Sequence, residues 1–383
     1  MSVYLDNAAT TPLDPAVLDA MLPFLRDNYG NPSSIHAQGR TARSAIETSR
    51  KKIAGLLNTS SSNIYFTAGG TEGDNTVIRG FIDALEIGHV VSTRIEHHAV
   101  LHTLEYMETS GKCKISYLDL DHQGNIDYGQ LESLLQNNRG SLVCLMHGNN
   151  EIGNLLDLER TGAICVEHDA WFHSDTVQTV GKYSFDLNRL AIDAAVGSAH
   201  KFHGPKGSGF LYLNPRNKIH PLIHGGGQEK EMRSGTENVA GIVGLAKAFE
   251  ISCRDMEKNR SWIINLKDKM ISLLKEQIPG IKFNGNVLDP GKSLYNIVSV
   301  SLPVQDDKNL VLFKLDLEQV SASGGSACAS GALKGSHVIN ALGNADGTVT
   351  IRFSFSKFNT LKDVDIAVGT LKKILDQFSL TRE

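Results

Sequence analysis

Short apolar runs alternate with amphipathic segments over the first two thirds of the chain. Seven runs are typical of buried strands, at 63–67, 89–93, 114–118, 142–147, 170–173, 191–196 and 209–213. Between most of these runs, apolar residues recur at helical spacing, as they do within 33–57 and 127–136. Only the last two runs are joined without a helix. This alternation indicates βαβ crossovers, and we expect an α/β fold with a largely parallel sheet.

The pattern changes after Thr236. A long helical stretch runs to about Gln277, with a break expected near 259–261. Further strands are expected at 295–301, 318–322 and 349–355. We therefore predict a large domain at 14–255 and a smaller α+β domain formed by 1–13 and 256–383.

Composition and charge exclude several classes of protein. The 38 basic and 42 acidic residues give a formal net charge of −4, which argues against a nucleic-acid-binding surface. The chain contains no run of 18 apolar residues and no secretory signal at its start, so we expect neither a membrane span nor export. Five cysteines without paired CxxC spacing fit a reducing cytoplasm. Fourteen histidines include no HExxH pattern, and we predict no metal site.

One cysteine differs from the other four in its surroundings. Cys328 stands within the run SGGSACASG at 323–331, whose small residues cannot bury it. The others lie among apolar or helix-forming residues and are typical of small buried groups or incidental surface thiols: Cys113, Cys144, Cys165 and Cys253. Cys328 is therefore either a chance member of a flexible connector or a nucleophile on an exposed loop. The run alone does not decide between these readings.

Two further segments carry candidate chemistry at strand ends. Lys201, in the run SAHKFHGPKG, lies just past an apolar strand, where open α/β sheets bind ligands. A lysine in this position beside His200 suits a Schiff base, although an ordinary surface lysine fits the segment equally well. The glycines at 69–75 join a strand to a helix, so their N–H groups form a phosphate cradle to which Thr71 adds a hydroxyl.

A phosphate cradle and a Schiff-base lysine together imply pyridoxal 5′-phosphate (PLP). Such a site also needs a carboxylate at the pyridinium nitrogen, so that the ring can accept electrons. Asp175, which follows the strand at 170–173, supplies this carboxylate. The conjunction of these strand-end residues is far more specific than any one of them.

Ten motifs along nearly the whole chain resemble those of the cysteine desulfurases of the NifS and IscS type, which are fold-type I PLP enzymes similar to class V aminotransferases. The matching segments are YLDNAATTP at 4–12, GNPSSIH at 30–36, GGTEGDN at 69–75, EHHAV at 96–100, HGNNEIG at 147–153, DTVQTVGK at 175–182, SAHKFHGPKG at 198–207, RSGTEN at 233–238, SGGSACASG at 323–331 and IRFSF at 351–355. The resemblance implies a homodimer. Each subunit would have a mainly parallel seven-stranded sheet in its large domain and the catalytic cysteine loop in its small domain.

The resemblance also implies a role for each candidate residue. Lys201 would hold PLP and later carry the substrate Cα proton, Asp175 would pair with the pyridinium nitrogen, and Gln178 would bind the ring hydroxyl. His97 would stack on the ring and take part in proton transfer. The remaining assignments are the phosphate ligands Gly70, Thr71, Ser198 and His200, with Thr236 from the other subunit, and the substrate-carboxylate ligands Asn150 and Arg352.

The activity implied by the resemblance is removal of sulfur from L-cysteine, which gives L-alanine and a persulfide on Cys328. A cytoplasmic acceptor protein, such as an iron–sulfur scaffold, would receive this sulfur. The chain departs from the family at Thr176, where alanine is frequent, and a hydroxyl there would crowd or polarise the ring face. It also stops at Glu383, without the extension that helps some relatives to dock a scaffold, so the identity of the acceptor is open.

Five alternatives to a desulfurase stay open at this stage. A selenocysteine lyase is the enzyme most similar to a desulfurase, whereas a kynureninase-like hydrolase or an aminotransferase would have no need of Cys328. A sulfur-trafficking protein that has lost turnover would keep the fold, and a nucleotide-binding protein would use only the loop at 69–75.

Overall fold

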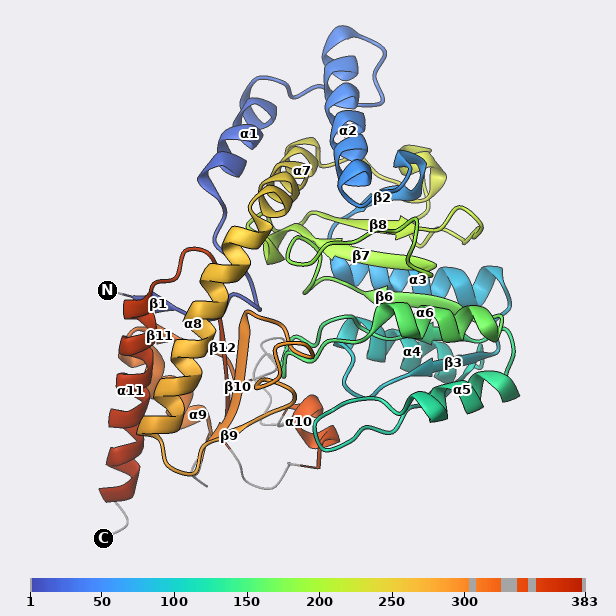
Figure 1. Ribbon diagram of the computed structural model, residues 1–383. Helices are drawn as coiled ribbons and strands as arrows, with labels where there is room; N and C mark the ends of the chain where they lie inside the picture. The colour runs from blue at the N-terminus through green and yellow to red at the C-terminus, as the bar shows by residue number, and fades with distance from the viewer. Residues whose placement is uncertain (1, 303–307, 325–335, 344–348, 381–383) are drawn as a thin grey trace.

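A seven-stranded sheet organises the larger part of the chain in this computed structural model, which describes residues 2–302, 308–324, 336–343 and 349–380 (Figure 1). The strands, in spatial order, are β2 (Ile64–Thr67), β8 (Gly209–Leu213), β7 (Ala194–Ser198), β6 (Trp171–Asp175), β5 (Leu142–Cys144), β3 (His89–Ser92) and β4 (Lys114–Tyr117). Strands β3 to β7 are mutually parallel, and β8 is antiparallel to both of its neighbours. The predicted mainly parallel sheet is therefore confirmed. The reversal at β8 follows from its connection to β7 without a crossover helix.

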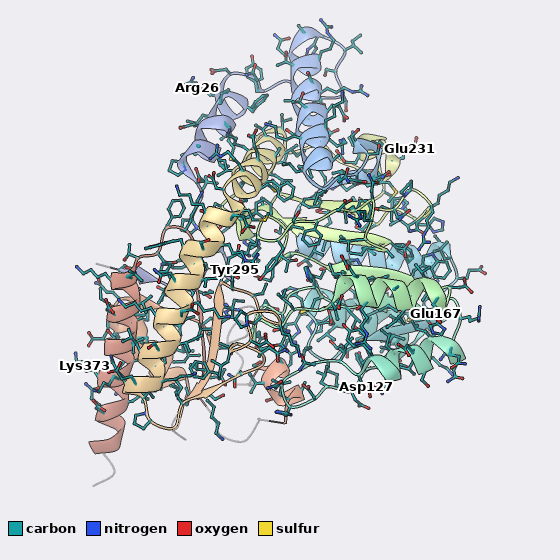
Figure 2. The ribbon with its side chains drawn as sticks, viewed as in Figure 1. Arg26, Asp127, Glu167, Glu231, Tyr295 and Lys373 are labelled. Carbon is teal, nitrogen blue, oxygen red and sulfur yellow. The ribbon has the colours of Figure 1, made fainter. Side chains whose placement is uncertain are left out.

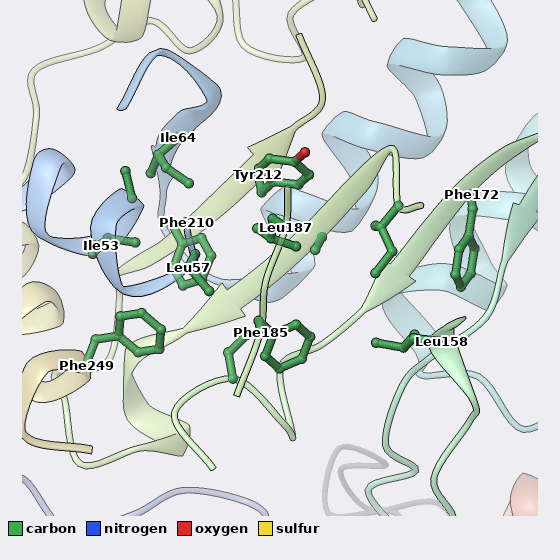
Figure 3. Close-up of a cluster of buried hydrophobic side chains, with 14 of the residues drawn as sticks. Ile53, Leu57, Ile64, Leu158, Phe172, Phe185, Leu187, Phe210, Tyr212 and Phe249 are labelled. Atoms are coloured by element: carbon green, nitrogen blue, oxygen red, sulfur yellow. The ribbon is translucent and has the colours of Figure 1, made fainter. Parts of the chain in front are cut away.

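Helices cover both faces of this sheet, which explains its continuous apolar strands. On one face lie α3 (Gly70–Ala84) and α4 (His98–Thr109), and on the other lie α5 (Tyr128–Asn137) and α6 (Leu158–Glu167) (Figure 1). Asp127 and Asp157 begin α5 and α6 by accepting hydrogen bonds from backbone N–H groups of the first turn. Figure 3 shows part of the core on the α5–α6 side, where Phe172 and Phe210 are almost completely buried.

A smaller antiparallel sheet has a hydrophobic core of its own. Its order is β12 (Val349–Ser354), β10 (Ile297–Leu302) and β9 (Lys282–Phe283). The helices α8 (Met256–Gln277), α9 (Lys308–Leu317) and α11 (Leu361–Leu380) pack around it. The N-terminal strand β1 (Val3–Tyr4) pairs in parallel with β11 (Val320–Ser321), and α10 (His337–Ala341) is a short helix before β12. The chain start thus lies beside the last third of the sequence. The domain limits given above stay a prediction.

The long helical stretch breaks four residues earlier than the sequence predicts. Helix α7 (Val239–Arg254) is followed by its C-cap residue Asp255, and α8 begins at Met256, so the expected break at 259–261 is wrong. Asn259 and Ser261 have modest helix propensity, but Ile263 and Leu266 on the same helix are buried in the smaller core. Tertiary packing therefore overrides local propensity here. Helix α7 also packs against α1 (Pro15–Arg26) and α2 (Ala37–Leu56) (Figure 1).

Tyr295 connects the two parts of the molecule. Its ring centroid lies 5.4 Å from that of Tyr183, and its hydroxyl donates to the Lys182 carbonyl oxygen at 3.3 Å. Figure 2 labels this residue between α8 and the large sheet. The contact holds the start of β10 against the loop that follows β6, next to the cavity described below.

Candidate active site

A cavity of about 330 Å³ lies at the carboxyl ends of β6 and β7, where the large sheet meets Arg352 of β12. Carboxyl ends of parallel strands favour such a site because their connecting loops converge there. The cavity brings together ten residues that the sequence singled out: Gly70, Thr71, His97, Asn150, Asp175, Gln178, Ser198, His200, Lys201 and Arg352. Thr236 is exposed and does not line it. Cys328 lies outside the described residues.

The N-terminal segment holds Lys201 in this cavity. The lysine ends a short 3₁₀ turn after β7, and its Nζ donates to the carbonyl oxygens of Ala8 at 2.7 Å and Ala9 at 2.9 Å. The preceding residue, His200, lies 3.2 Å through Nδ1 from the hydroxyl of Thr10. Burial, and then the charge of Lys201, lowers the pKa of His200 to about 4, so its imidazole is uncharged near neutral pH.

Two side chains at the end of β6 present acceptors to the cavity. Asp175 is the last residue of β6, and its Oδ1 accepts the backbone N–H of Val177 at 2.9 Å. Gln178 donates through Nε2 to Ala8 at 3.0 Å, while its buried Oε1 has no hydrogen-bond partner among the described residues. A buried oxygen without a partner is costly, so Gln178 fits a ligand that donates a hydrogen bond, such as a ring hydroxyl.

Thr176 does not occupy the position expected from the sequence. Its hydroxyl donates to the Val196 carbonyl oxygen at 2.7 Å, and the residue does not line the cavity. The expectation that this hydroxyl crowds or polarises a bound ring is therefore wrong. Its side chain instead satisfies a carbonyl group of the neighbouring strand β7.

The start of α3 provides backbone N–H groups that can bind an anion. Its N-cap residue, Gly69, has no side chain to cap the first turn, so the exposed N–H groups of that turn are available to an anion. A Cβ atom on Gly70 would lie only 2.6 Å from Cγ2 of Val177, so glycine is required for this close approach. Together with Lys201, Asp175 and Gln178, the cradle matches the four polar groups of PLP: its aldehyde, ring nitrogen, ring hydroxyl and phosphate.

Several histidines surround the far side of the cavity. His97 accepts the backbone N–H of Ala99 through Nδ1 at 3.1 Å, so the proton of its uncharged ring lies on Nε2. Burial lowers its pKa. His98 and His102, four residues apart on α4, stack at 4.7 Å, and His98 lies 4.4 Å from His337. This HxxxH spacing was not among the predicted features, yet no group of three or more candidate ligands within the described ranges is arranged to hold a metal.

The part of the cavity next to β12, called the substrate end below, contains a buried arginine with two acidic residues nearby. Arg352 is only 1% exposed, and its guanidinium donates to Oδ1 of Asp6 at 2.6 Å and to the Asn150 carbonyl oxygen at 2.7 Å. Glu151, next along the chain, is hydrogen-bonded to Ser336, and burial raises its pKa. Arg352 and Asn150 are predicted site residues and the two acids are not, although Asp6 lies in the motif at 4–12 and Glu151 in that at 147–153.

The family pattern for Aminotransferase class-V matches residues 3–366. This chain belongs to the class V aminotransferase family. It is 41% identical over 381 residues to a cysteine desulfurase IscS of Dictyoglomus turgidum, an alignment covering 98% of this chain and 95% of the relative. It is 40% identical over 381 residues to the IscS of Methanosarcina thermophila, with 98% and 92% of the two chains covered.

Solved structures give the same assignment. A NifS-like protein matches this class V chain with a TM-score of 0.90 at 36% identity, over 98% of this chain and 100% of the other. A NifS-like protein from Rickettsia africae matches with a TM-score of 0.88 at 32% identity and the same coverage. The resemblance carried by the ten sequence motifs is therefore confirmed, as is the predicted fold class.

None of the described cysteines of this class V protein lines the cavity. Cys113, Cys144 and Cys165 are buried and Cys253 is half-buried. Burial raises the pKa of all four thiols, to about 11 in Cys113 and Cys253. Because the thiolate is the reactive form, these four are poor nucleophiles near neutral pH. Among the helices that the structure describes, none is both long and apolar enough to span a bilayer.

Proposed function

We propose that this class V protein is a PLP-dependent cysteine desulfurase that transfers sulfur from L-cysteine to Cys328. The observation that carries the proposal is one cavity in which Lys201, Asp175 and the α3 cradle face buried Arg352. The names of the IscS relatives support it. So does a protein whose structure is described as SspA in complex with cysteine, which matches 94% of this chain and 100% of that one with a TM-score of 0.79 at 32% identity.

The cofactor end holds PLP through four groups of side chains and N–H donors. Bound PLP supplies a sink for the electrons released at the substrate Cα. Lys201 would bind its aldehyde, and its Nζ would accept the substrate Cα proton. Asp175 keeps a proton on the ring nitrogen, and Gln178 accepts the ring hydroxyl through Oε1. The phosphate ligands are Gly70, Thr71, Ser198 and His200.

The substrate end orients L-cysteine. Arg352 binds the α-carboxylate, because a guanidinium forms strong, paired hydrogen bonds with a carboxylate. Asn150 assists from the loop after β5. His97 is uncharged near neutral pH, because burial lowers its pKa, and its Nε2 is available to move a proton at the reacting substrate.

Cys328 is the proposed nucleophile, since the other four thiols are shielded by burial. Its thiolate attacks the substrate sulfur, so that an S–S bond forms while the Cβ–S bond of the substrate breaks. The substrate carbon accepts the bonding electrons and a proton and leaves as L-alanine. One thiol and one L-cysteine thus give one persulfide and one L-alanine, and no external oxidant or reductant is needed.

We propose a homodimer in which Thr236, exposed in the single chain, completes the phosphate site of the other subunit. The persulfide would pass to a sulfur-acceptor protein, such as an iron–sulfur scaffold, in the cytoplasm. Near-balanced charge gives no support for a nucleic acid as direct partner.

The deciding experiment is incubation with L-cysteine followed by mass spectrometry of the Cys328 peptide. We expect that peptide to gain the mass of one sulfur, which a reductant removes, and we expect one L-alanine per turnover. Cys328→Ala should lose sulfide release, whereas Cys113→Ser, a matched loss of one thiol, should keep it. Sulfide release that survives in Cys328→Ala would contradict the proposal.

A further inference from the structure

A buried aspartate–histidine pair lies beside the cofactor end and has no role in the chemistry above. Asp74 of α3 and His173 of β6 each have 1% of their side chain exposed, and Asp74 Oδ1 lies 3.0 Å from His173 Nε2. His173 Nδ1 lies 3.2 Å from the carbonyl oxygen of Ala194, its partner on the adjacent strand β7. Asp74 lines the cavity and His173 does not.

These two contacts fix the number of protons in the pair. A carbonyl oxygen can only accept, so the Nδ1 of His173 must carry hydrogen. In an uncharged imidazole Nε2 is then an acceptor, and Asp74 must donate as a carboxylic acid. If the imidazole were doubly protonated instead, it would donate to an Asp74 carboxylate. One proton lies in the contact in both cases, so the pair as a whole has no net charge.

The surroundings favour the form in which both members are uncharged. Burial lowers the pKa of His173 to about 4, while burial and the nearby Asp175 raise that of Asp74. Glu96, in the loop before α4, is also buried, and its pKa is raised to about 8. Among the described residues, His97, His200 and Lys201 also line the cavity at this end. Near neutral pH, neither the pair nor Glu96 therefore adds a net negative charge at this end.

We propose that Asp74 and His173 act as a single uncharged, hydrogen-bonded pair beside Asp175, which leaves Asp175 as the carboxylate that pairs with the nitrogen of bound PLP. His173 and Asp175 are two positions apart on β6, so their side chains lie on the same face of the sheet. Asp74 lies three residues after Thr71 on α3, so both belong to one face of that helix. The pair therefore ties the ring-nitrogen end of the site to its phosphate end. Asp74 and His173 are positioning residues, and the inference rests on the proposed function.

The first test compares PLP binding by Asp74→Asn and Asp74→Ala. Asparagine keeps an uncharged donor to His173 Nε2 and nearly the same shape, so we expect the affinity for PLP and the visible absorption band to stay as in the wild type. Alanine leaves Nε2 without a donor, and we expect PLP to bind at least about tenfold more weakly. The exposed imidazole nitrogen can then be protonated beside Asp175, so the loss should grow as the pH falls from about 8 to about 6.

The ratio of the PLP affinities of these two variants decides between the possible outcomes. Affinity at least about tenfold higher in Asp74→Asn than in Asp74→Ala supports the uncharged pair. Any smaller ratio overturns it, either because the negative charge of Asp74 is what matters or because the pair does nothing for the cofactor. A wild type that gains no visible band on addition of PLP would contradict the proposed function instead.

A second measurement does not depend on PLP. Nitrogen-15 chemical shifts of histidine-labelled wild-type protein report the tautomer directly, and the His173 signals are those lost in His173→Gln. We expect a protonated Nδ1 and an unprotonated, hydrogen-bonded Nε2 that does not titrate between about pH 6 and about pH 8. Two protonated nitrogens near pH 7 would overturn the inference.

Discussion

The two ends of the cavity are assembled in different ways. At the cofactor end, Asp175 is the last residue of β6 and Lys201 follows β7, so both residues are positioned by adjacent strands of one sheet. At the substrate end, Arg352 comes from β12 of the smaller sheet. Its partners Asp6 and Asn150 are 346 and 202 residues away along the chain. One end depends on a single sheet, and the other depends on how separate segments dock.

Because of this difference, we expect amino-acid substitutions at the two ends of the cavity to have different effects on binding. Strands β6 and β7 are buried almost throughout, so the backbone that positions the cofactor groups is held by the large core. The guanidinium of Arg352 is instead held by an ion pair and by a carbonyl group, across the junction between the two sheets. Loss of a group that holds PLP at the first end should therefore impair the binding of the cofactor, whereas substitutions at the second end should mainly weaken the binding of L-cysteine.

The largest effect is expected at the cofactor end, from Lys201→Ala. Loss of the amino group removes both the covalent link to PLP and the Cα proton acceptor, so turnover should fall by at least about 10³-fold. The visible absorption band of the bound cofactor should also disappear. Both are checked by absorbance and by L-alanine release, with the exposed lysine variant Lys206→Ala as the matched control. A Lys201→Ala protein that kept the band would refute the assignment.

A smaller and different effect is expected at the substrate end, from Arg352→Lys. Lysine keeps the charge but cannot form paired hydrogen bonds with the substrate carboxylate, so kcat/KM should fall by about 100-fold. The loss should lie mainly in KM, and the absorption band of bound PLP should be unchanged. Because Arg352 is fully buried, the Tm of the variant is measured alongside the kinetics. A lost band, or a fall confined to kcat, would show that the two ends are not separable.

The same difference explains what the sequence could predict. Lys201, Asp175 and Thr71 each follow a recognisable strand, and strand ends of a parallel sheet converge whatever the rest of the fold does. Their meeting could therefore be inferred from local patterns. The contact of Asp6 with Arg352 could not, because it depends on the N-terminal segment pairing with the last strand of the smaller sheet.

Some of the missed features did leave a local signal. His173 is the one histidine in the apolar strand AWFHSD, and a polar group in a buried strand must find a partner. That argument predicts a hydrogen bond for His173 but cannot name Asp74, which lies 99 residues away. The helix break at Asp255 is similar: the burial of Ile263 and Leu266, which decides it, is a property of the packed molecule.

The smallest effect, and the sharpest test of the comparison, is expected from Asp6→Asn. The Asp6 carboxylate holds the Arg352 guanidinium at 2.6 Å without belonging to the large sheet. Asparagine keeps the size of the side chain and can still accept one hydrogen bond, but it removes the charge that fixes the guanidinium. We expect KM for L-cysteine to rise by about fivefold, with kcat and PLP affinity changed by less than about twofold. If Asp6 instead competes with the substrate for Arg352, KM will fall, and steady-state kinetics will show which of the two relations holds.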